Sequence, residues 1–432
     1  MNKKLAIRTV LMLLAIAAIF GIYQALQAYF KDFSGFGHAD SVGAIVALED
    51  TVSGTKAVAF DPNGTKREIP DGSESSRDTD FSWSPDGDFV YLASNRDPSS
   101  KTKGSGAFNI FRWKFGADHI ETMTDQRRSM SAPRFSKADP PKMGVVIAGG
   151  NVLQAQFESS KTTLEQIMPP INKNRVAGSE GEGTSEGGSI YSKWGNSFRQ
   201  AFYLPGHTGM LAVMRRDDGE VLVFHDFRMT GDPPQPKRPV GILAGSRIQL
   251  DVTDDGRFVV SQQDVTVPDP EQVPKEWLKD GKLFPNLGGT PFHHMIWYGN
   301  LDSDGVPHPS PMLPPAPKPE DEVLFLDPKI SPDGKTLVVV LARRPKPNET
   351  SPQGLLLIPL AADGAGQPKP MIQGEIAQPS WSPDSTTILF TMMSGGKRSI
   401  YSMGADGSAP VKVAGDANYS FPQYSPQIKK KA

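Results

Sequence analysis

Short apolar runs that alternate with polar turns fill most of the chain beyond residue 42. Each run is rich in Val, Ile, Leu, Phe and Tyr and is bounded by Pro, Asp, Gly or Ser, a pattern typical of β-strands joined by tight turns. Three turns share one sequence, and each precedes an apolar run: Ser84-Pro85-Asp86-Gly87 before 89–93, Ser331-Pro332-Asp333-Gly334 before 337–341, and Ser382-Pro383-Asp384 before 388–392. The pattern predicts a strand, a tight turn and a second strand in each copy.

The repeated turn residues have a structural explanation. Pro presets φ at the second turn position, Asp hydrogen-bonds to nearby backbone, and Gly accepts the left-handed dihedral that ends such a turn. A divergent copy at 252–256 and a truncated copy at 423–426 extend the series. Because a residue that recurs with a repeat serves the repeat, we interpret these aspartates as structural. For the same reason we expect Trp83 and Trp381, which occupy matching positions, to pack between neighbouring units.

Two further strands follow the turn unit. Residues 399–403 and 411–413 are apolar runs separated by Asp406-Gly407-Ser408, and residues 57–60 and 66–69 repeat that arrangement. Four antiparallel strands in every unit of about 40–50 residues form the blade of a β-propeller. We therefore predict an all-β propeller of four-stranded blades.

The number of blades follows from the first strand of each unit. We expect these first strands near residues 81, 133, 200, 249, 329, 380 and 421. The last has no room for further strands, whereas strands near 43–48, 55–60 and 65–69 have no first strand before them. Pairing of the C-terminal strand with these N-terminal strands would close the ring and remove exposed edges. We favour seven blades; six is the alternative, because one degenerate unit could be an insertion.

These turns, together with Asp406-Gly407-Ser408, resemble WD40-like (PD40) repeats. Such repeats are the units of the TolB-type β-propeller family and of the propeller in prolyl-oligopeptidase-like peptidases. The resemblance covers most of residues 42–426, although the units near 134–136 and 204–206 depart from the motif. It implies a propeller, usually of about six blades in the TolB type, that engages protein partners of the cell envelope. No partner-contact residue can be carried over from the motif.

The N-terminus predicts a membrane anchor. Basic residues within 1–8 precede an apolar run at 9–30, which as a helix would reach about 33 Å, enough to span a bilayer. The positive-inside rule then places residues 1–8 in the cytoplasm. The chain after the span, which begins with a linker at 31–41, is therefore expected to be exported. We expect a single-pass protein of the bacterial inner membrane with a periplasmic propeller at 42–426 and a solvated basic tail at 427–432. The alternative is a cleaved signal and release into the periplasm. This anchor departs from the TolB-type resemblance, because TolB-type proteins are expected to be soluble.

Charge and composition exclude several classes of function. The 432 residues include 46 basic and 48 acidic side chains, a net charge of −2, which argues against nucleic acid as a partner. The absence of cysteine excludes disulfides, thiolate catalysis and Cys-ligated metals. Gly-x-Ser-x-Gly occurs at Gly183 to Gly187, but within a Gly/Glu/Ser stretch that has the composition of a mobile loop and not between the strand and helix of a nucleophile elbow. No phosphate-binding loop or His-Glu-x-x-His motif occurs, so we predict no catalytic residue, cofactor or metal. Asp302-Ser303-Asp304-Gly305 lacks the further ligands of a calcium loop and is interpreted as a hairpin turn.

Two segments are longer than blade connections require. Residues 264–293 form an insertion, in which Glu271 to Lys279 could make a short helix, and the Pro-rich residues 306–319 should favour polyproline II. Long ordered loops often carry function. We select as candidate partner-binding residues Trp277, His293, His294, Pro314 and Pro315. Adjacent histidines on an extended chain point to opposite sides, so loop packing or partner contact is favoured over a shared metal.

These observations favour a non-enzymatic scaffold, a membrane-anchored periplasmic propeller that binds envelope proteins. The alternative is a propeller enzyme or ligand sensor, similar to hydrolases or lactonases, with its site in the central channel. That alternative predicts that several Asp, Glu, Asn or His side chains converge at one mouth of the channel.

Overall fold

The computed structural model describes residues 41–426 apart from 97–105, 136–142, 158–161, 169–196, 217–218, 231–234, 237–239, 266–277, 280–281, 284–291, 313–322, 347–348 and 362–363. The predicted membrane span and basic tail lie outside the described residues. Within the part described, no helix is long and apolar enough to cross a bilayer. The sheets belong to the compact unit formed by Ser41–Lys114 and His119–Ala432.

The strands pair antiparallel into sheets whose members mostly follow one another along the chain. The first sheet holds β1 (Ile45–Thr51), β2 (Gly54–Phe60), β3 (Lys66–Glu68) and β32 (Tyr419–Tyr424); the second holds β4 (Asp78–Trp83), β5 (Phe89–Ser94), β6 (Asn109–Lys114) and β7 (Ile120–Thr122). The third holds β8 (Arg134–Phe135), β9 (Met143–Ala148), β10 (Asn151–Phe157) and β11 (Thr162–Met168).

The middle of the chain forms one larger sheet of β12 (Ser197–Tyr203), β13 (Gly209–Arg216), β14 (Gly219–Asp226), β17 (Val240–Val252), β18 (Phe258–Val265), β21 (Phe292–Leu301) and β22 (Pro307–Pro311). Next come β23 (Val323–Ile330), β24 (Thr336–Lys346), β25 (Glu349–Ala361), β26 (Gly364–Ala365) and β27 (Lys369–Gln373), then β28 (Ile376–Trp381), β29 (Thr387–Ser394), β30 (Lys397–Gly404) and β31 (Val411–Ala414). Two small ribbons, β15 (Met229–Thr230) with β16 (Gln235–Pro236) and β19 (Leu278–Lys279) with β20 (Lys282–Leu283), and the 3-10 turn η1 (Pro205–His207) complete the described elements.

The larger sheet is two units joined by one long strand. The first half of β17 pairs with β14, from Val240 to Gly245, and its second half pairs with β18, from Ser246 to Val252. A register shift separates Ser246 from Gln249 in the second pairing. The strand therefore ends one four-stranded unit and begins the next, where separate strands joined by a turn were expected.

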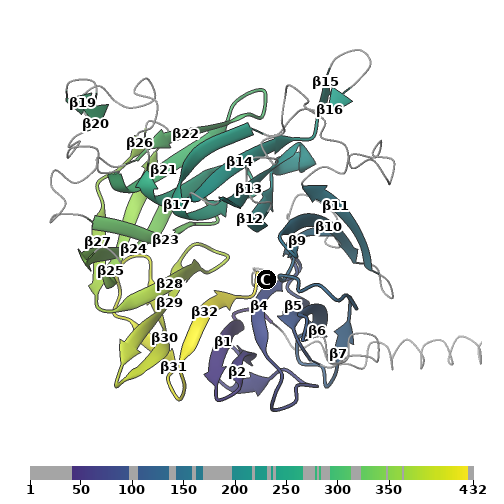
Figure 1. Ribbon diagram of the computed structural model, residues 1–432. Coiled ribbons are helices and arrows are strands. Elements are labelled where there is room, and N and C mark those ends of the chain that lie inside the picture. Colours follow the sequence, from purple (N-terminus) through teal and green to yellow (C-terminus); the bar gives the residue numbers. More distant parts are fainter. Residues whose placement is uncertain are drawn as a thin grey trace, which may run out of the picture. The chain divides into compact units, whose positions relative to one another are not determined.

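The first strands of the units lie toward a common centre in Figure 1, and later strands lie further out. A strand is present at every position where a first strand was predicted: β4, β8, β12, the second half of β17, β23, β28 and β32. The C-terminal strand β32 pairs antiparallel with β1, from Ile45 opposite Tyr424 to Glu49 opposite Tyr419. The predicted pairing of the two ends of the propeller region is confirmed.

Successive sheets pack face to face through apolar clusters. Between the last sheet and the first, Leu389 and Ile400 pack with Val58, Phe60 and Tyr419, all buried. Such sheet-on-sheet burial supplies most of the favourable free energy of an all-β fold.

One tryptophan of the repeat, Trp381, packs between units as predicted and is partly buried. Trp381 packs in the cluster between its own sheet and the preceding one and donates from Nε1 to the Lys329 carbonyl of that sheet, at 2.9 Å. The equivalent Trp83 is buried.

The Ser-Pro-Asp turns share one hydrogen-bond pattern. In the first, Ser84 Oγ donates to Asp86 Oδ1 at 2.5 Å and accepts from the Phe89 amide at 2.9 Å. The same two contacts measure 2.6 and 3.0 Å in the turn at Ser331, and 2.6 and 2.9 Å in the turn at Ser382. The aspartates of the repeat therefore accept hydrogen bonds within their own turns.

One of these turns carries a strained residue. Ser385 adopts φ 63° where the other two turns have Gly87 and Gly334, at 73° and 69°. A left-handed dihedral is unfavourable for any residue with a Cβ, so the free energy of unfolding of Ser385→Gly should exceed that of Ser385→Ala, which lacks the same hydroxyl, by about 0.5–1 kcal/mol in urea titrations. Ser385→Ala is the matched control. It keeps the strain and loses the hydroxyl that accepts the Asp333 amide at 3.0 Å, so it should be less stable than wild type. Equal stability of the glycine and alanine variants would contradict this explanation.

The turn aspartates also predict how stability depends on pH. Hydrogen bonding from the Ser382 hydroxyl lowers the pKa of Asp384. A carboxylate whose pKa is lower in the folded state stabilises the fold above its unfolded pKa of about 4, and this contribution is lost as the pH falls through the folded value. Asp384→Asn should therefore be less stable than wild type at pH 7, and the gap should narrow toward pH 3. A gap that stays constant in urea titrations across this range would exclude the ionised carboxylate as its source.

Two expectations for the loops are wrong where the structure describes them. Pro307–Pro311 is not polyproline II but strand β22, paired with β21. Proline occupies every second position of β22, so the missing backbone N–H groups all fall on one side of the strand. An edge strand tolerates such a loss. Leu278–Lys279, the end of the expected helix, is strand β19. The insertion is also shorter than predicted, because β18 runs to Val265 and β21 begins at Phe292.

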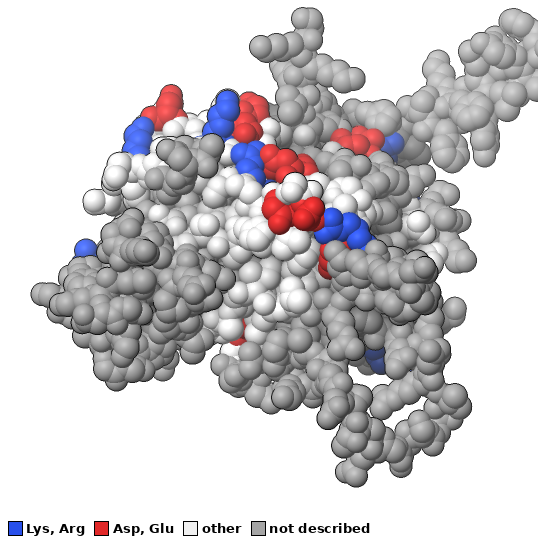
Figure 2. Space-filling view, turned by 90° about the horizontal axis from the view of Figure 1, so that it is seen from above, with Lys and Arg blue, Asp and Glu red and all other residues white. Residues whose placement is uncertain are grey.

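Figure 2 shows acidic and basic side chains beside one another on the face seen from above. Several charged residues of the described chain form close ion pairs, such as Lys66 with Glu49 at 2.7 Å and Arg228 with Asp226 at 2.6 Å. Charges paired in this way produce little long-range field.

Candidate functional site

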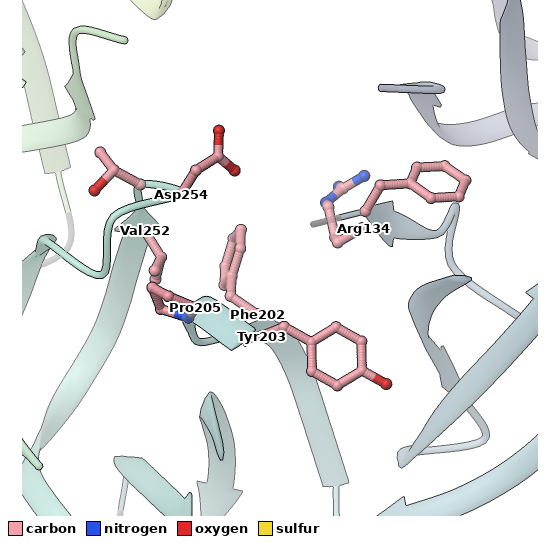
Figure 3. A pocket seen from close by; sticks show the side chains of 8 residues that line it. Arg134, Phe202, Tyr203, Pro205, Val252 and Asp254 are labelled. Atoms are coloured by element: carbon pink, nitrogen blue, oxygen red, sulfur yellow. The ribbon is translucent and has the colours of Figure 1, made fainter. Parts of the chain in front are cut away.

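A pocket lies where the turn-side ends of three first strands meet (Figure 3). Its cavity volume is about 30 Å³, and it opens to solvent. Strands β8, β12 and β17, with the turns that follow β12 and β17, supply the lining: Arg134, Phe135, Phe202, Tyr203, Pro205, Val252, Thr253 and Asp254. In Figure 3 the charged groups of Arg134 and Asp254 lie on opposite sides of the open space, and the ring of Phe202 stands at its edge below Asp254.

Neighbouring strands hold the pocket side chains in place. Arg134 Nη2 donates to both carboxylate oxygens of Asp80, at 2.9 and 3.1 Å, and Nη1 donates to the Phe81 carbonyl at 3.2 Å. The Tyr203 hydroxyl donates to Gln154 Oε1 at 2.8 Å, and its ring stacks on His207 at 4.2 Å. Side chains fixed before binding lose little conformational entropy when a ligand arrives.

The first strands of four successive units carry a second repeated feature. Strands β17, β23, β28 and β32 each contain a β-bulge, at which two residues face one residue of the adjacent strand. The first residue of each bulge has a left-handed φ: 47° at Arg247, 49° at Asp327, 55° at Gln378 and 51° at Phe421. Bulges re-aim side chains and are common beside functional sites.

Hydrogen bonds connect these bulges from one unit to the next. Gln249 exchanges two bonds with Asp327, its Nε2 donating to Oδ1 at 2.5 Å and its Oε1 accepting from the Asp327 amide at 2.8 Å. Asp327 Oδ2 accepts from the Gln378 amide at 3.1 Å, and Gln378 Oε1 accepts from the Phe421 amide at 2.9 Å. We call this series, from Gln249 to Phe421, the bulge relay; it fixes the first strands of the four units relative to one another.

The residues selected from the sequence as partner contacts do not come together in the part of the chain that is described. His294 is 7% exposed, and its Nε2 accepts a hydrogen bond from the Phe325 amide at 2.8 Å, so it packs between β21 and β23. This position matches the packing alternative for that residue. His293 lies on β21, but its side chain lies outside the described residues, as do Trp277, Pro314 and Pro315.

The acidic hairpin at Asp302 is a turn, as predicted. Its Oδ1 accepts from the Asp304 and Val306 amides at 2.8 and 2.9 Å, and its Oδ2 contacts His308 Nε2 at 2.8 Å. Among the described residues, no group of three His, Asp or Glu side chains is placed to hold a metal ion.

Sequence reasoning did not find the pocket or the bulge relay. The pocket joins residues that are far apart in the chain and belong to degenerate units, so no local motif marks them. The bulges do have a sequence signal, because three of their left-handed residues directly precede proline and lie four positions before the serine of a Ser-Pro turn: Asp327, Gln378 and Phe421.

Antiparallel four-stranded units whose first strands face a common centre define a β-propeller. Among solved structures, a protein from Lactobacillus plantarum is similar to 87% of this chain and 96% of its own at 11% identity, with a TM-score of 0.50. TolB from Acinetobacter baumannii (11% identity, 89% and 83% covered, TM-score 0.42) and the β-propeller domain of Cps50 (Swd1) from Myceliophteria thermophila (10% identity, 81% and 91% covered, TM-score 0.48) are also similar. Identities at this level concern the fold alone. No protein-family model and no curated protein matches the sequence.

Proposed function

We propose that this protein is a membrane-anchored β-propeller of the bacterial periplasm that binds other envelope proteins and acts as a scaffold for their assembly. The apolar run at 9–30 would hold it in the inner membrane. Seven blades, counted with β17 divided between two of them, would close into a ring through the mixed sheet of β32 and β1. Such a ring presents its turns and pockets on a rigid frame.

The pocket of Figure 3 is the observation that carries a binding role. Two aromatic residues, Phe202 and Tyr203, line it together with Arg134, and all three come from first strands. Tyr and Arg are among the residues that contribute most to protein–protein affinity, and aromatic residues are enriched where such interfaces are fully buried. Concave sites with a few fixed polar groups are the usual form of a binding pocket.

The carboxylates along the first strands favour binding over hydrolysis. Asp327 is engaged by Gln249 and by the Gln378 amide, as described above. Asp251 accepts from Lys329 Nζ at 2.8 Å and from the Ile330 amide at 3.0 Å. Asp80 holds Arg134. These groups join one unit to the next, whereas a general acid or base must be able to reach the substrate.

Site-specific photocrosslinking tests the binding role. A benzophenone amino acid in place of Phe202, expressed at native level in intact cells, should form discrete crosslinks to one or a few proteins at high yield. The same probe at Val411, an exposed residue on the outer strand β31, is the matched control. Recovery of uncrosslinked protein alone, or the same crosslinks from both positions, would rule out the pocket as the docking site.

The proposed location has its own test, which the absence of cysteine makes simple. Val52, at a fully exposed hairpin tip, can be changed to cysteine as the single thiol of the chain. A maleimide that cannot cross membranes should label this thiol in intact spheroplasts. Labelling only after lysis would place the propeller in the cytoplasm.

A further inference from the structure

Phe421 is an exception within the bulge relay. At the two preceding bulges, Asp327 and Gln378 use their side chains to accept the backbone amide of the next bulge. A phenyl ring at Phe421 has no atom that can accept such a bond, so the relay stops at this residue. The ring is instead 52% exposed.

The backbone at Phe421 is also unfavourable for its side chain. A left-handed φ of 51° is a genuine outlier for a bulky residue, whereas Asn, Asp and Gly adopt it more readily. In the relay, Asp327 and Gln378 offset their left-handed dihedrals with hydrogen bonds that their side-chain oxygens accept. Phe421 combines a strained backbone, an exposed apolar ring and no such bond, and strained residues of this kind cluster at functional sites. Fold stability alone does not explain a phenylalanine here.

The equivalent position in β17 is occupied by a cation. Arg247 is the left-handed residue of its own bulge, and its side chain is exposed. It forms no ion pair with any residue in the described ranges. The carboxylate between these two bulges, that of Asp327, is already engaged through both oxygens. The bulge positions therefore expose one apolar ring and one cation.

We propose that Phe421 anchors an apolar side chain of a partner polypeptide and that Arg247 pairs with an acidic residue of the same partner. This inference rests on the proposed function in taking the partner to be a polypeptide, and it adds the partner's chemistry: an aromatic or aliphatic residue accompanied by carboxylates. Exposed aromatic and arginine side chains are the types that dominate polypeptide recognition.

Replacing Phe421 should weaken peptide binding without lowering the melting temperature. Phe421→Gln places the residue of the preceding bulge in the relay, and Phe421→Asn supplies a side chain that tolerates a left-handed φ. We expect both variants of the full chain to melt no lower than wild type and to lose peptide binding. A residue that served only the fold would give lower melting temperatures in both.

Binding is measured with defined peptides and a fluorine reporter. 4-Fluorophenylalanine at position 421 of the purified full chain is titrated with acetyl-Trp-Glu-Glu-amide and with acetyl-Trp-Lys-Lys-amide. We expect a saturable ¹⁹F shift with the acidic peptide and about tenfold weaker binding of the basic one. Arg247→Ala should abolish this preference, and Phe202→Ala should leave the shift unchanged.

Each other outcome overturns the inference. Absence of a saturable shift with either peptide would remove Phe421 as an anchor, and equal affinity for the two would remove the acidic partner. Melting temperatures lowered in both Phe421 variants would assign the ring to the fold. Failure of the proposed function is recognised separately, because it would appear as missing crosslinks at Phe202 in cells, and this titration does not use that site.

Discussion

Replacing Arg96 by methionine is expected to lower the free energy of unfolding by about 3–5 kcal/mol, because it leaves the carboxylate of Asp78 buried without its cation. The two side chains are 3% and 1% exposed, and Arg96 Nη2 lies 2.7 Å from Asp78 Oδ2. Arg96 also donates to the carbonyls of Ile69 and Pro70, and Asp78 accepts the Ala57 amide at 2.8 Å. This single pair therefore fixes the connection between the first and second sheets.

Two further variants test whether the loss comes from the burial of the ion pair. Arg67→Met breaks an ion pair of similar length, 2.6 Å to Asp61, but Arg67 is 45% exposed, so the loss should stay below about 1 kcal/mol. The double variant Arg96→Met/Asp78→Asn should recover part of the loss, because no unpaired charge remains buried. The measurement is urea unfolding at pH 7. Equal losses for Arg96→Met and Arg67→Met would show that the buried pair has no special role.

Removal of residues 418–432 is expected to destabilise the protein by about 5 kcal/mol or more, which is comparable to the whole stability of many domains. The deletion removes β32, the partner of β1. It also removes Tyr419, which is 1% exposed and packs edge-on against Phe60 at 5.5 Å; truncation of a buried aromatic residue alone costs about 3–5 kcal/mol. The uncovered edge of β1 should promote association between chains.

A shorter deletion gives the control. Removing only 427–432 spares β32 and should leave the thermal unfolding transition unchanged. Calorimetry and size-exclusion chromatography of both deletions test the closure directly. A cooperative, monomeric, wild-type-like transition after loss of 418–432 would show that the first sheet does not depend on its C-terminal strand.

Local sequence was sufficient for the repeating part of the fold. The Ser-Pro-Asp turns could be predicted because each contains its own hydrogen bonds, from Ser84 to Asp86 and from the Phe89 amide to Ser84. The unpaired C-terminal strand near 421 could be assigned to the N-terminal strands because an edge must be covered. These arguments need only nearby residues and a count of strands.

The remaining features depend on contacts between distant residues. No local pattern places Arg134 beside Phe202, or Asp327 beside Gln249, because each pair belongs to different sheets. His294 was chosen for its residue type and loop position, and it is buried because β23 packs against it. The strand at Pro307–Pro311 was missed because composition was given more weight than the alternation of its prolines.

The affinity of the full chain for the partner crosslinked at Phe202 tests the central claim most directly. Binding is measured in detergent by isothermal titration calorimetry for wild type, Phe202→Ala and the exposed control Val411→Ala, with the melting temperature of each recorded. The pocket as docking site predicts a Kd at least about tenfold weaker for Phe202→Ala and unchanged for Val411→Ala. The same Kd for all three folded proteins would contradict it.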